Sequence, residues 1–293
     1  MTEHQTHHSL DDLLTLMANL RHPELGCSWD KKQTLQKLTA YTLEEVHEVI
    51  DAVERNDDAQ LQDELGDLLF QIVFYAQIAA EEGRFAFADI VHSITDKLLR
   101  RHPHIFPDAT LASFGASSAA GITAEQVAAN WELIKNAERE RKAVGADNLA
   151  AVSLMDDVPS SLPAMDRARK LQKRAASIGF DWADHRPVLA KLQEEIAELE
   201  LEVAAGDHEK ISAEFGDVLF TCANLARHLD VDPETALRAS NRKFESRFRQ
   251  LEQRGAAVAG SLATLSNVEM NTLWDEIKKS EAGSVNKTDQ RDP

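Results

Sequence analysis

The chain has 293 residues with 50 acidic and 32 basic side chains, and its formal net charge of -18 argues against a protein that binds nucleic acid by neutralising phosphates. Hydrophobic residues make up 43% and charged residues 28%, which is typical of a globular protein and excludes wholesale disorder. Twelve glycines, eight prolines and 6% aromatic residues are too few for a turn-rich β-protein, so the composition predicts an all-α fold.

The first ten residues are polar, and no run of about 18 apolar residues occurs anywhere. We therefore expect no secretory signal, no contact with a membrane and a cytoplasmic protein. Cys27 and Cys222 are too few for a disulfide framework and lack the paired spacing of a zinc site. Both are expected to be packing residues.

Apolar side chains recur at three- and four-residue steps in residues 43–53 and again in residues 61–76. This periodicity predicts two amphipathic helices. The segment between them, residues 55–58 (RNDD), has the composition of a turn, so the helices are expected to form an antiparallel hairpin.

The hairpin carries acidic residues on one side of each helix. Glu44 and Glu45 precede Glu48 by four and three residues on the first helix. On the second helix, Glu64 precedes Asp67 by three residues. Like charges at this spacing destabilise a helix, so the grouping predicts a bound cation, and a carboxylate-only set favours a hard ion such as Mg²⁺. The alternative is a solvated acidic face, which we disfavour because the acids lie beside Leu and Phe at core-like spacing.

Two segments between the periodic regions have the small, polar composition of linkers, residues 107–125 and 143–153. They indicate a domain boundary near residue 150. We assign a first domain at residues 1–142 with an Ala/Ser-rich insertion at 107–125, a linker at 143–160, a second domain at 161–280 and a disordered tail at 281–293.

The second half of the chain repeats the first. Residues 194–220 match residues 44–70 at a constant offset of 150, with a turn expected at residues 204–207. Five acidic positions coincide, together with a shared G-D-x-L-F motif. The paired acids are Glu44/Glu194, Glu45/Glu195, Glu48/Glu198, Glu64/Glu214 and Asp67/Asp217. Each copy is therefore predicted to be a whole domain.

The pattern E-E-x-x-E, followed 16 residues later by E-x-x-D, occurs in both copies. It resembles the MazG family of nucleoside triphosphate pyrophosphohydrolases, which belongs to the all-α NTP pyrophosphohydrolase superfamily. Segments such as HPELGCSWDKKQT, ELGDLLFQIVFYAQIA, GFDW and NRKFESRF extend the resemblance over most of residues 10–280. The longer Ala/Ser-rich stretch at 107–125 departs from the family pattern.

The resemblance implies hydrolysis of nucleoside triphosphates, ATP among them, to the monophosphate and pyrophosphate with Mg²⁺, or Mn²⁺ as a substitute. It also implies a role in nucleotide-pool house-cleaning or stress-related nucleotide control. Two tandem MazG-like domains would each present a hairpin that forms a four-helix-bundle-like site in a homodimer. We expect the second half to be the main site.

The resemblance also assigns roles to single residues. Those expected to hold metal are Glu195, Glu198, Glu214 and Asp217 in the second copy and Glu45, Glu48, Glu64 and Asp67 in the first. Those expected at the phosphates and nucleotide are Lys243, Arg247, Trp274 and Lys278, with Lys97, Arg101, Trp131 and Lys135 in the first copy. Glu194 or Glu44 is the candidate to orient or deprotonate the attacking water. Trp29 and Trp182 either line a nucleotide pocket or staple the domain, and we favour the staple.

Two other classes of protein remain as alternatives. A ferritin-like di-iron protein needs Glu-x-x-His, which Glu44 and His47 provide, but Ala197 replaces the histidine in the second copy. A non-catalytic helical module for nucleotide sensing or protein interaction would be marked by a missing carboxylate or cation in both copies. Neither copy lacks one, so an enzyme is preferred.

Overall fold

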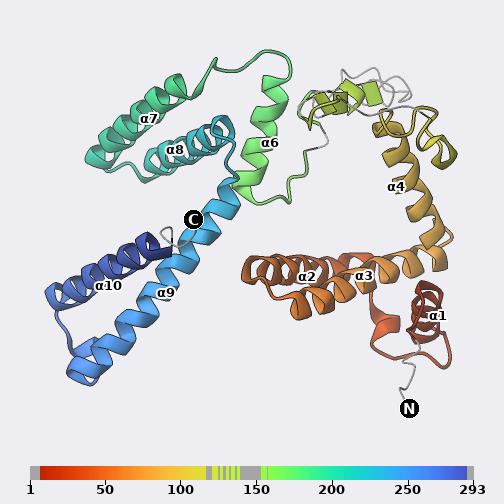
Figure 1. The fold of residues 1–293 in the computed structure, drawn as a ribbon, viewed down its shortest axis with the longest axis horizontal. Helices are drawn as coiled ribbons and strands as arrows, with labels where there is room; N and C mark the ends of the chain where they lie inside the picture. Colours follow the sequence, from red (N-terminus) through yellow and green to blue (C-terminus); the bar gives the residue numbers. More distant parts are fainter. Residues whose placement is uncertain are drawn as a thin grey trace. The chain divides into compact units, whose positions relative to one another are not determined.

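The computed structural model describes residues 7–116, 121–138 apart from 125, 128, 129, 132 and 136, and 153–288 apart from 157. These residues form α-helices and short 3-10 helices without a β-strand among them, which confirms the all-α prediction (Figure 1). The chain divides into two compact units, Met1–Asp147 and Asn148–Pro293. In the described ranges, no helix has the length and apolar character needed to cross a bilayer.

The first unit includes, in chain order, the helices α1 (Leu10–Leu20), α2 (Leu35–Arg55), α3 (Asp58–Glu81) and α4 (Phe87–Arg101). The described residues between 124 and 138 are also helical. Two 3-10 helices accompany them, η1 (Asp30–Lys32) and η2 (Leu111–Ser113). Side chains cap the helix starts. Ser9 and Asp12 form a capping box on α1, and the Thr34 side chain accepts a hydrogen bond from the backbone of Lys37 in α2.

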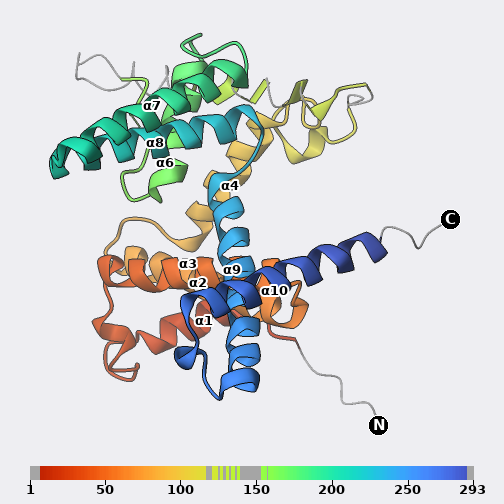
Figure 2. The same cartoon turned by 90° about the vertical axis from the view of Figure 1, so that its left-hand side faces the viewer.

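The second unit contains α6 (Ala164–Ala176), α7 (His185–Ala205), α8 (His208–His228), α9 (Pro233–Ala259), η3 (Leu262–Thr264) and α10 (Asn267–Thr288). The pair α7 and α8 forms one hairpin and the pair α9 and α10 forms another (Figure 1, Figure 2). The helix α10 continues to Thr288, so it includes residues 281–288 of the segment expected to be a disordered tail. The rest of that tail, residues 289–293, lies outside the described residues.

The duplication is visible in the helix boundaries, because α7 begins and ends at an offset of 150 from α2, and α8 begins at the same offset from α3. Both predicted turns are confirmed. Asn56 and Gly206 end the first helix of each hairpin in the left-handed conformation, with φ of 54° and 78°. The next residue in each copy, Asp57 or Asp207, caps the second helix with its carboxylate.

The core of the first unit packs α1, α2 and α3 together through Met17, Leu38, Val73, Phe74 and Ile78. Other apolar residues of the hairpins are not covered within the unit. Leu43 is 57% exposed, and Phe215 and Phe220 of the second hairpin are 53% and 45% exposed. The apolar periodicity therefore identified helix faces correctly, but part of each face lies at the surface.

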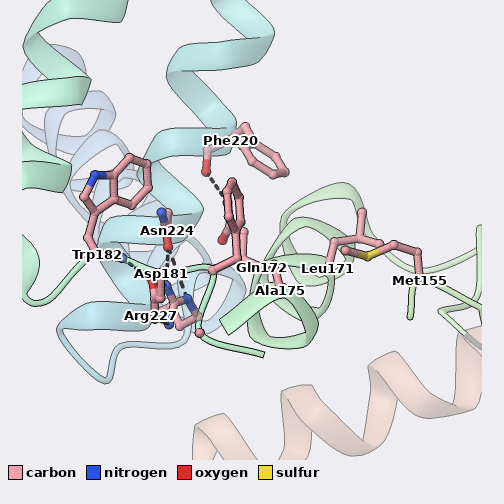
Figure 3. A pocket seen from close by; sticks show the side chains of 11 residues that line it. Met155, Leu171, Gln172, Ala175, Asp181, Trp182, Phe220, Asn224 and Arg227 are labelled. Carbon is pink, nitrogen blue, oxygen red and sulfur yellow. Dashed lines mark hydrogen bonds and ion pairs between the residues drawn. The ribbon is translucent and has the colours of Figure 1, made fainter. Parts of the chain in front are cut away.

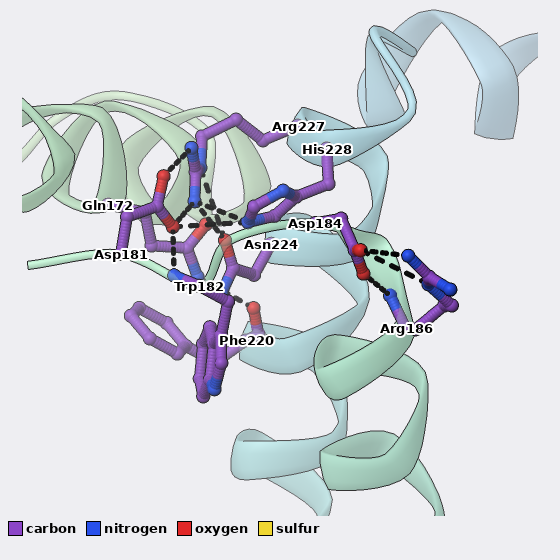
Figure 4. A network of polar contacts seen from close by, with 9 residues as sticks. All are labelled: Gln172, Asp181, Trp182, Asp184, Arg186, Phe220, Asn224, Arg227 and His228. Atoms are coloured by element: carbon purple, nitrogen blue, oxygen red, sulfur yellow. Dashed lines mark hydrogen bonds and ion pairs between the residues drawn. The ribbon is translucent and has the colours of Figure 1, made fainter.

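Hydrogen bonds and an ion pair connect the loop between α6 and α7 to α8 (Figure 4). Arg227 donates to both carboxylate oxygens of Asp181, with Nη1 2.8 Å from Oδ2, and also binds Asn224. His228 Nε2 lies 3.1 Å from Asp181 Oδ1. The guanidinium of Arg227 holds the pKa of Asp181 below its ordinary value of 3.8. The network ties residues 179–182 to the hairpin that carries the acidic cluster.

We predict that Asp181→Asn lowers the free energy of unfolding by about 1–2 kcal/mol at pH 7, because it removes a charge-assisted pair that is largely shielded from water. Because the pKa of Asp181 is lower in the folded state than in the unfolded state, its ionised carboxylate stabilises the fold at a pH above the unfolded-state pKa. This stabilisation is lost as the pH falls through the folded-state pKa. The deficit should therefore shrink below about pH 4. Urea unfolding across pH measures it.

The matched control is Asp184→Asn in the same loop. Asp184 pairs with Arg186, whose side chain is 80% exposed, and an asparagine retains the cap at the start of α7. A loss of stability in the control equal to that of Asp181→Asn would contradict a specific role for the Asp181 network.

Candidate metal and nucleotide site

The predicted acidic residues of α7 and α8 converge on one side of the second hairpin. Carboxylate oxygens of Glu195, Glu214 and Asp217 lie within 4.8 Å of one another. Glu195 is only 6% exposed. Glu198 lies one turn further along α7, and its pKa is raised by loss of solvent and by the charges of Glu195 and Glu214, against the lowering effect of Lys191.

The first hairpin carries a similar cluster with one different member. Carboxylate oxygens of Glu45, Glu48 and Glu64 lie within 4.8 Å of one another, so this cluster includes Glu48 in place of Asp67, the counterpart of Asp217. The pKa of Glu45 is raised first by burial and then by the charges of Asp67, Glu64 and Glu44, while a hydrogen bond from Gln71 opposes this effect. Burial and the charge of Glu64 likewise raise the pKa of Glu48. Each hairpin thus brings together three of the four carboxylates expected to hold metal.

Lys191 is a member of the second cluster that the sequence analysis missed. Its Nζ lies 2.7 Å from Glu194 Oε1 and 2.8 Å from Glu195 Oε1, and these carboxylates raise the lysine pKa. The corresponding residue of the first copy is Tyr41. The spacing of three and four residues from Glu194 and Glu195 is the signal that identifies this lysine.

The predicted nucleotide-binding residues of the second copy gather on the other hairpin of the unit. Lys243 and Arg247 lie one turn apart on α9, and Trp274 and Lys278 lie one turn apart on α10. The ring of Trp274 packs 5.5 Å from the ring of Phe244, and Lys278 pairs with Asp275 at 2.7 Å. Arg247 contacts Glu281 of α10.

The matching residues of the first copy also form a group. Lys97 and Arg101 lie on α4, and Arg101 contacts Glu138. The ring of His102 packs edge-on against Trp131 at 5.1 Å, and the Lys135 Nζ lies 5.6 Å from the same indole centroid. In each copy, therefore, the carboxylates form one cluster and the cations with the tryptophan form a second.

A cavity of about 530 Å³ opens between α6, the loop at residues 179–182 and α8 (Figure 3). Phe180, Trp182 and Phe220 supply aromatic walls, and the buried Gln172 donates a hydrogen bond from Nε2 to the Phe220 carbonyl at 2.8 Å. Trp182 is 43% exposed and lines this cavity, which agrees with the pocket-lining alternative for this residue.

Comparison with known proteins gives a consistent result. The family model described as the MazG nucleotide pyrophosphohydrolase domain matches residues 33–106 and again residues 183–251. The nucleoside triphosphate pyrophosphohydrolase of Escherichia coli (strain K12) is 47% identical over 93% of this chain and 98% of its own length. The nucleoside triphosphate pyrophosphohydrolase/pyrophosphatase MazG of Thermotoga maritima is 38% identical over 92% of this chain and 95% of its own.

We predict that Glu198→Gln leaves the helical fold intact and slightly raises the melting temperature of the metal-free protein, because it relieves repulsion within the cluster. Thermal unfolding in chelator, followed by circular dichroism, measures this. Adding Mg²⁺ should raise the melting temperature of the unsubstituted protein more than that of the variant.

The control is Glu200→Gln, an exposed acid two residues along α7 that faces away from Glu198. Its response to Mg²⁺ should match that of the unsubstituted protein. Unfolding of Glu198→Gln in chelator would show that this acid has a structural role instead.

Proposed function

The chain belongs to the MazG family and is a nucleoside triphosphate pyrophosphohydrolase, and on this basis we propose that its helix hairpins hold Mg²⁺ for hydrolysis of nucleoside triphosphates to the monophosphate and pyrophosphate. The observation that carries the proposal is the convergence of three of the four expected carboxylates in each hairpin, within 4.8 Å of one another, with Glu45/Glu195 and Glu64/Glu214 common to both copies. Hydrolysis of this bond requires charge neutralisation on the triphosphate, an activated water and a stabilised leaving group.

The donor set fits a hard divalent cation, because it offers carboxylate oxygens from two facing helices and no nitrogen or sulfur. Glu195, Glu214 and Asp217 would hold the ion in the second copy together with Glu198. Glu45, Glu48, Glu64 and Asp67 are their counterparts in the first. Bound Mg²⁺, or Mn²⁺ in its place, supplies charge neutralisation on the phosphates and a more acidic water.

The remaining side chains supply binding and proton transfer. Lys191, already held between Glu194 and Glu195, is placed to donate to a phosphate oxygen beside the metal carboxylates. Lys243 and Arg247 bind the outer phosphates, and Trp274 and Lys278 lie near the nucleotide. Glu194, which is 57% exposed at its side chain, orients the attacking water and accepts its proton.

We propose that the base contacts aromatic surface in one of two places, the Trp274 ring or the cavity lined by Trp182 and Phe220. Phe220 follows Asp217 by three residues on α8, so the cavity adjoins the helix that carries the carboxylates. Stacking on an indole tolerates any base, which suits a protein whose sequence carries no marker of base preference.

A homodimer completes the proposed site. Within the second unit, the carboxylates and the cations lie on different hairpins, and the apolar residues Ile196, Phe215 and Leu219 are 43%, 53% and 42% exposed. Covering such a face with a second copy of the hairpin forms a four-helix bundle and removes apolar surface from water. The same association would bring the cations of one subunit toward the carboxylates of the other subunit.

The proposed role is control of the nucleotide pool in the cytoplasm, by house-cleaning or in response to stress. The acidic surface, with a net charge of -18, is consistent with free nucleotides as substrates and with no role in holding nucleic acid. A non-catalytic sensing or interaction module is the weaker alternative, because both copies retain their carboxylates and cations.

We predict that water attacks the α phosphorus. The sequence has no G-x-x-x-x-G-K-[ST] loop for γ-phosphoryl transfer, and the cations would hold the outer two phosphates as one leaving unit. Hydrolysis in ¹⁸O-water should therefore place the label in the monophosphate, read by mass spectrometry. Chelator should abolish activity and Mg²⁺ or Mn²⁺ restore it. Release of the diphosphate and orthophosphate as first products would overturn the assignment.

We predict unequal contributions from the two copies. Asp217→Asn should reduce kcat by about 100-fold or more, because loss of one metal carboxylate removes most transition-state stabilisation. Asp67→Asn, the matched change in the copy that has Tyr41 in place of Lys191, should retain most activity. Steady-state release of pyrophosphate measures both. The reverse order of effects would make the first copy the principal site.

A further inference from the structure

Arg247 on α9 is held by Glu281 on α10 in a specific way. Its Nε and Nη2 atoms both contact the same oxygen, Glu281 Oε2, at 2.8 Å and 2.7 Å. The arginine side chain is 21% exposed and the glutamate side chain 34%. The contact is therefore partly shielded from solvent, where a charge-assisted pair is stronger than at an open surface.

The same contact occurs in the first copy. Arg101 Nε lies 3.2 Å from Glu138 Oε2, and Arg101 Nη2 lies 2.5 Å from that oxygen. Glu138 follows Trp131 by seven residues, as Glu281 follows Trp274. The two copies are built from different residues over most of these helices, so the repetition of both partners and of the same atoms indicates a shared role.

The geometry leaves the guanidinium able to bind a second anion. An arginine has five N–H donors, and the glutamate occupies only the edge formed by Nε and Nη2. One N–H of Nη1 and the second N–H of Nη2 form another edge, at the end of the guanidinium. This edge matches a pair of phosphate oxygens. A carboxylate on one edge and a phosphate on the other are thus compatible.

We propose that Glu281 is a positioning residue that orients Arg247 for the outer phosphates of the substrate, with Glu138 doing the same for Arg101. The inference rests on the proposed function, in which Arg247 binds phosphate. A free arginine side chain loses rotamer freedom when it binds, and an arginine already fixed by a neighbour loses less. Trp274, Lys278 and Glu281 recur at steps of four and three residues, so the glutamate follows the helix face that carries the other nucleotide-binding residues.

The test is a set of substitutions in the full-length protein with Mg²⁺ and nucleoside triphosphate as substrate. Because both contacts use one oxygen, a glutamine at position 281 can still accept them, whereas an alanine cannot. Glu281→Ala should raise KM about tenfold with a smaller change in kcat, and Glu281→Gln should raise it less than threefold, roughly the worth of one charge-assisted contact.

The decisive measurement is the double variant. If Glu281 acts through Arg247, Glu281→Ala should raise KM in the unsubstituted background and have no further effect when combined with Arg247→Ala. The matched control is Glu276→Gln on the same helix, whose carboxylate lies 3.9 Å from Arg254 at an exposed position and whose KM should not change.

The outcomes separate the two proposals. If Arg247→Ala leaves KM unchanged, its role at the phosphates is wrong and the positioning role falls with it. If Arg247→Ala raises KM but Glu281→Ala does not, or lowers it, only the positioning role is overturned. Equal and additive effects of the two substitutions would also overturn it, because they would show that Glu281 acts independently of the arginine.

Discussion

The repulsion between carboxylates is the constraint on which the architecture of each hairpin depends. Two antiparallel helices place acids from both sides within 4.8 Å of one another, and repulsion between these charges opposes folding. Glu195, in the second cluster, is only 6% exposed. Packing elsewhere must offset this cost. The capped turn at Asn56 and Asp57, repeated at Gly206 and Asp207, fixes the register that holds the acids opposite one another.

The two copies meet this constraint with different side chains. In the second copy, Lys191 places an ammonium group 2.8 Å from Glu195 and offsets part of the negative charge. In the first, the position of Lys191 is Tyr41, and the hydrogen bond that lowers the pKa of Glu45 comes from the neutral amide of Gln71. The ammonium group of Lys191 offsets negative charge, which the neutral amide of Gln71 cannot do. The second cluster is therefore less negative than the first. The two clusters are therefore expected to differ in metal affinity and in turnover.

Much of the fold was predictable from the sequence because its determinants are local. Apolar periodicity and turn composition predicted the middle of α2 and α3, at residues 43–53 and 61–76, and the turn between them, although the two helices extend further at their outer ends. The offset of 150 assigns the same hairpin and turn to the second copy. The grouping of Glu45, Glu48 and Glu64 follows from helical spacing once the hairpin is known. The contacts of Arg247 with Glu281 and of Arg101 with Glu138 depend on how separate helices pack, which periodicity does not specify. For the same reason the sequence left open whether Trp182 lines a pocket or staples the domain.

Periodicity also identifies a helix face without identifying what covers it. Leu43 and Phe215 belong to the apolar faces of their helices, and their spacing is that of core residues. Within this chain, however, these two residues are 57% and 53% exposed. One side of each hairpin thus carries clustered carboxylates that, on the proposed function, need a cation. The uncovered apolar side chains in turn need a hydrophobic partner. Both needs exceed what the other helices of the same unit supply. On the proposed function, a hairpin of this kind binds metal, nucleotide and a second hairpin. Each of these would add to its stability, so assembly and substrate binding are expected to be thermodynamically linked.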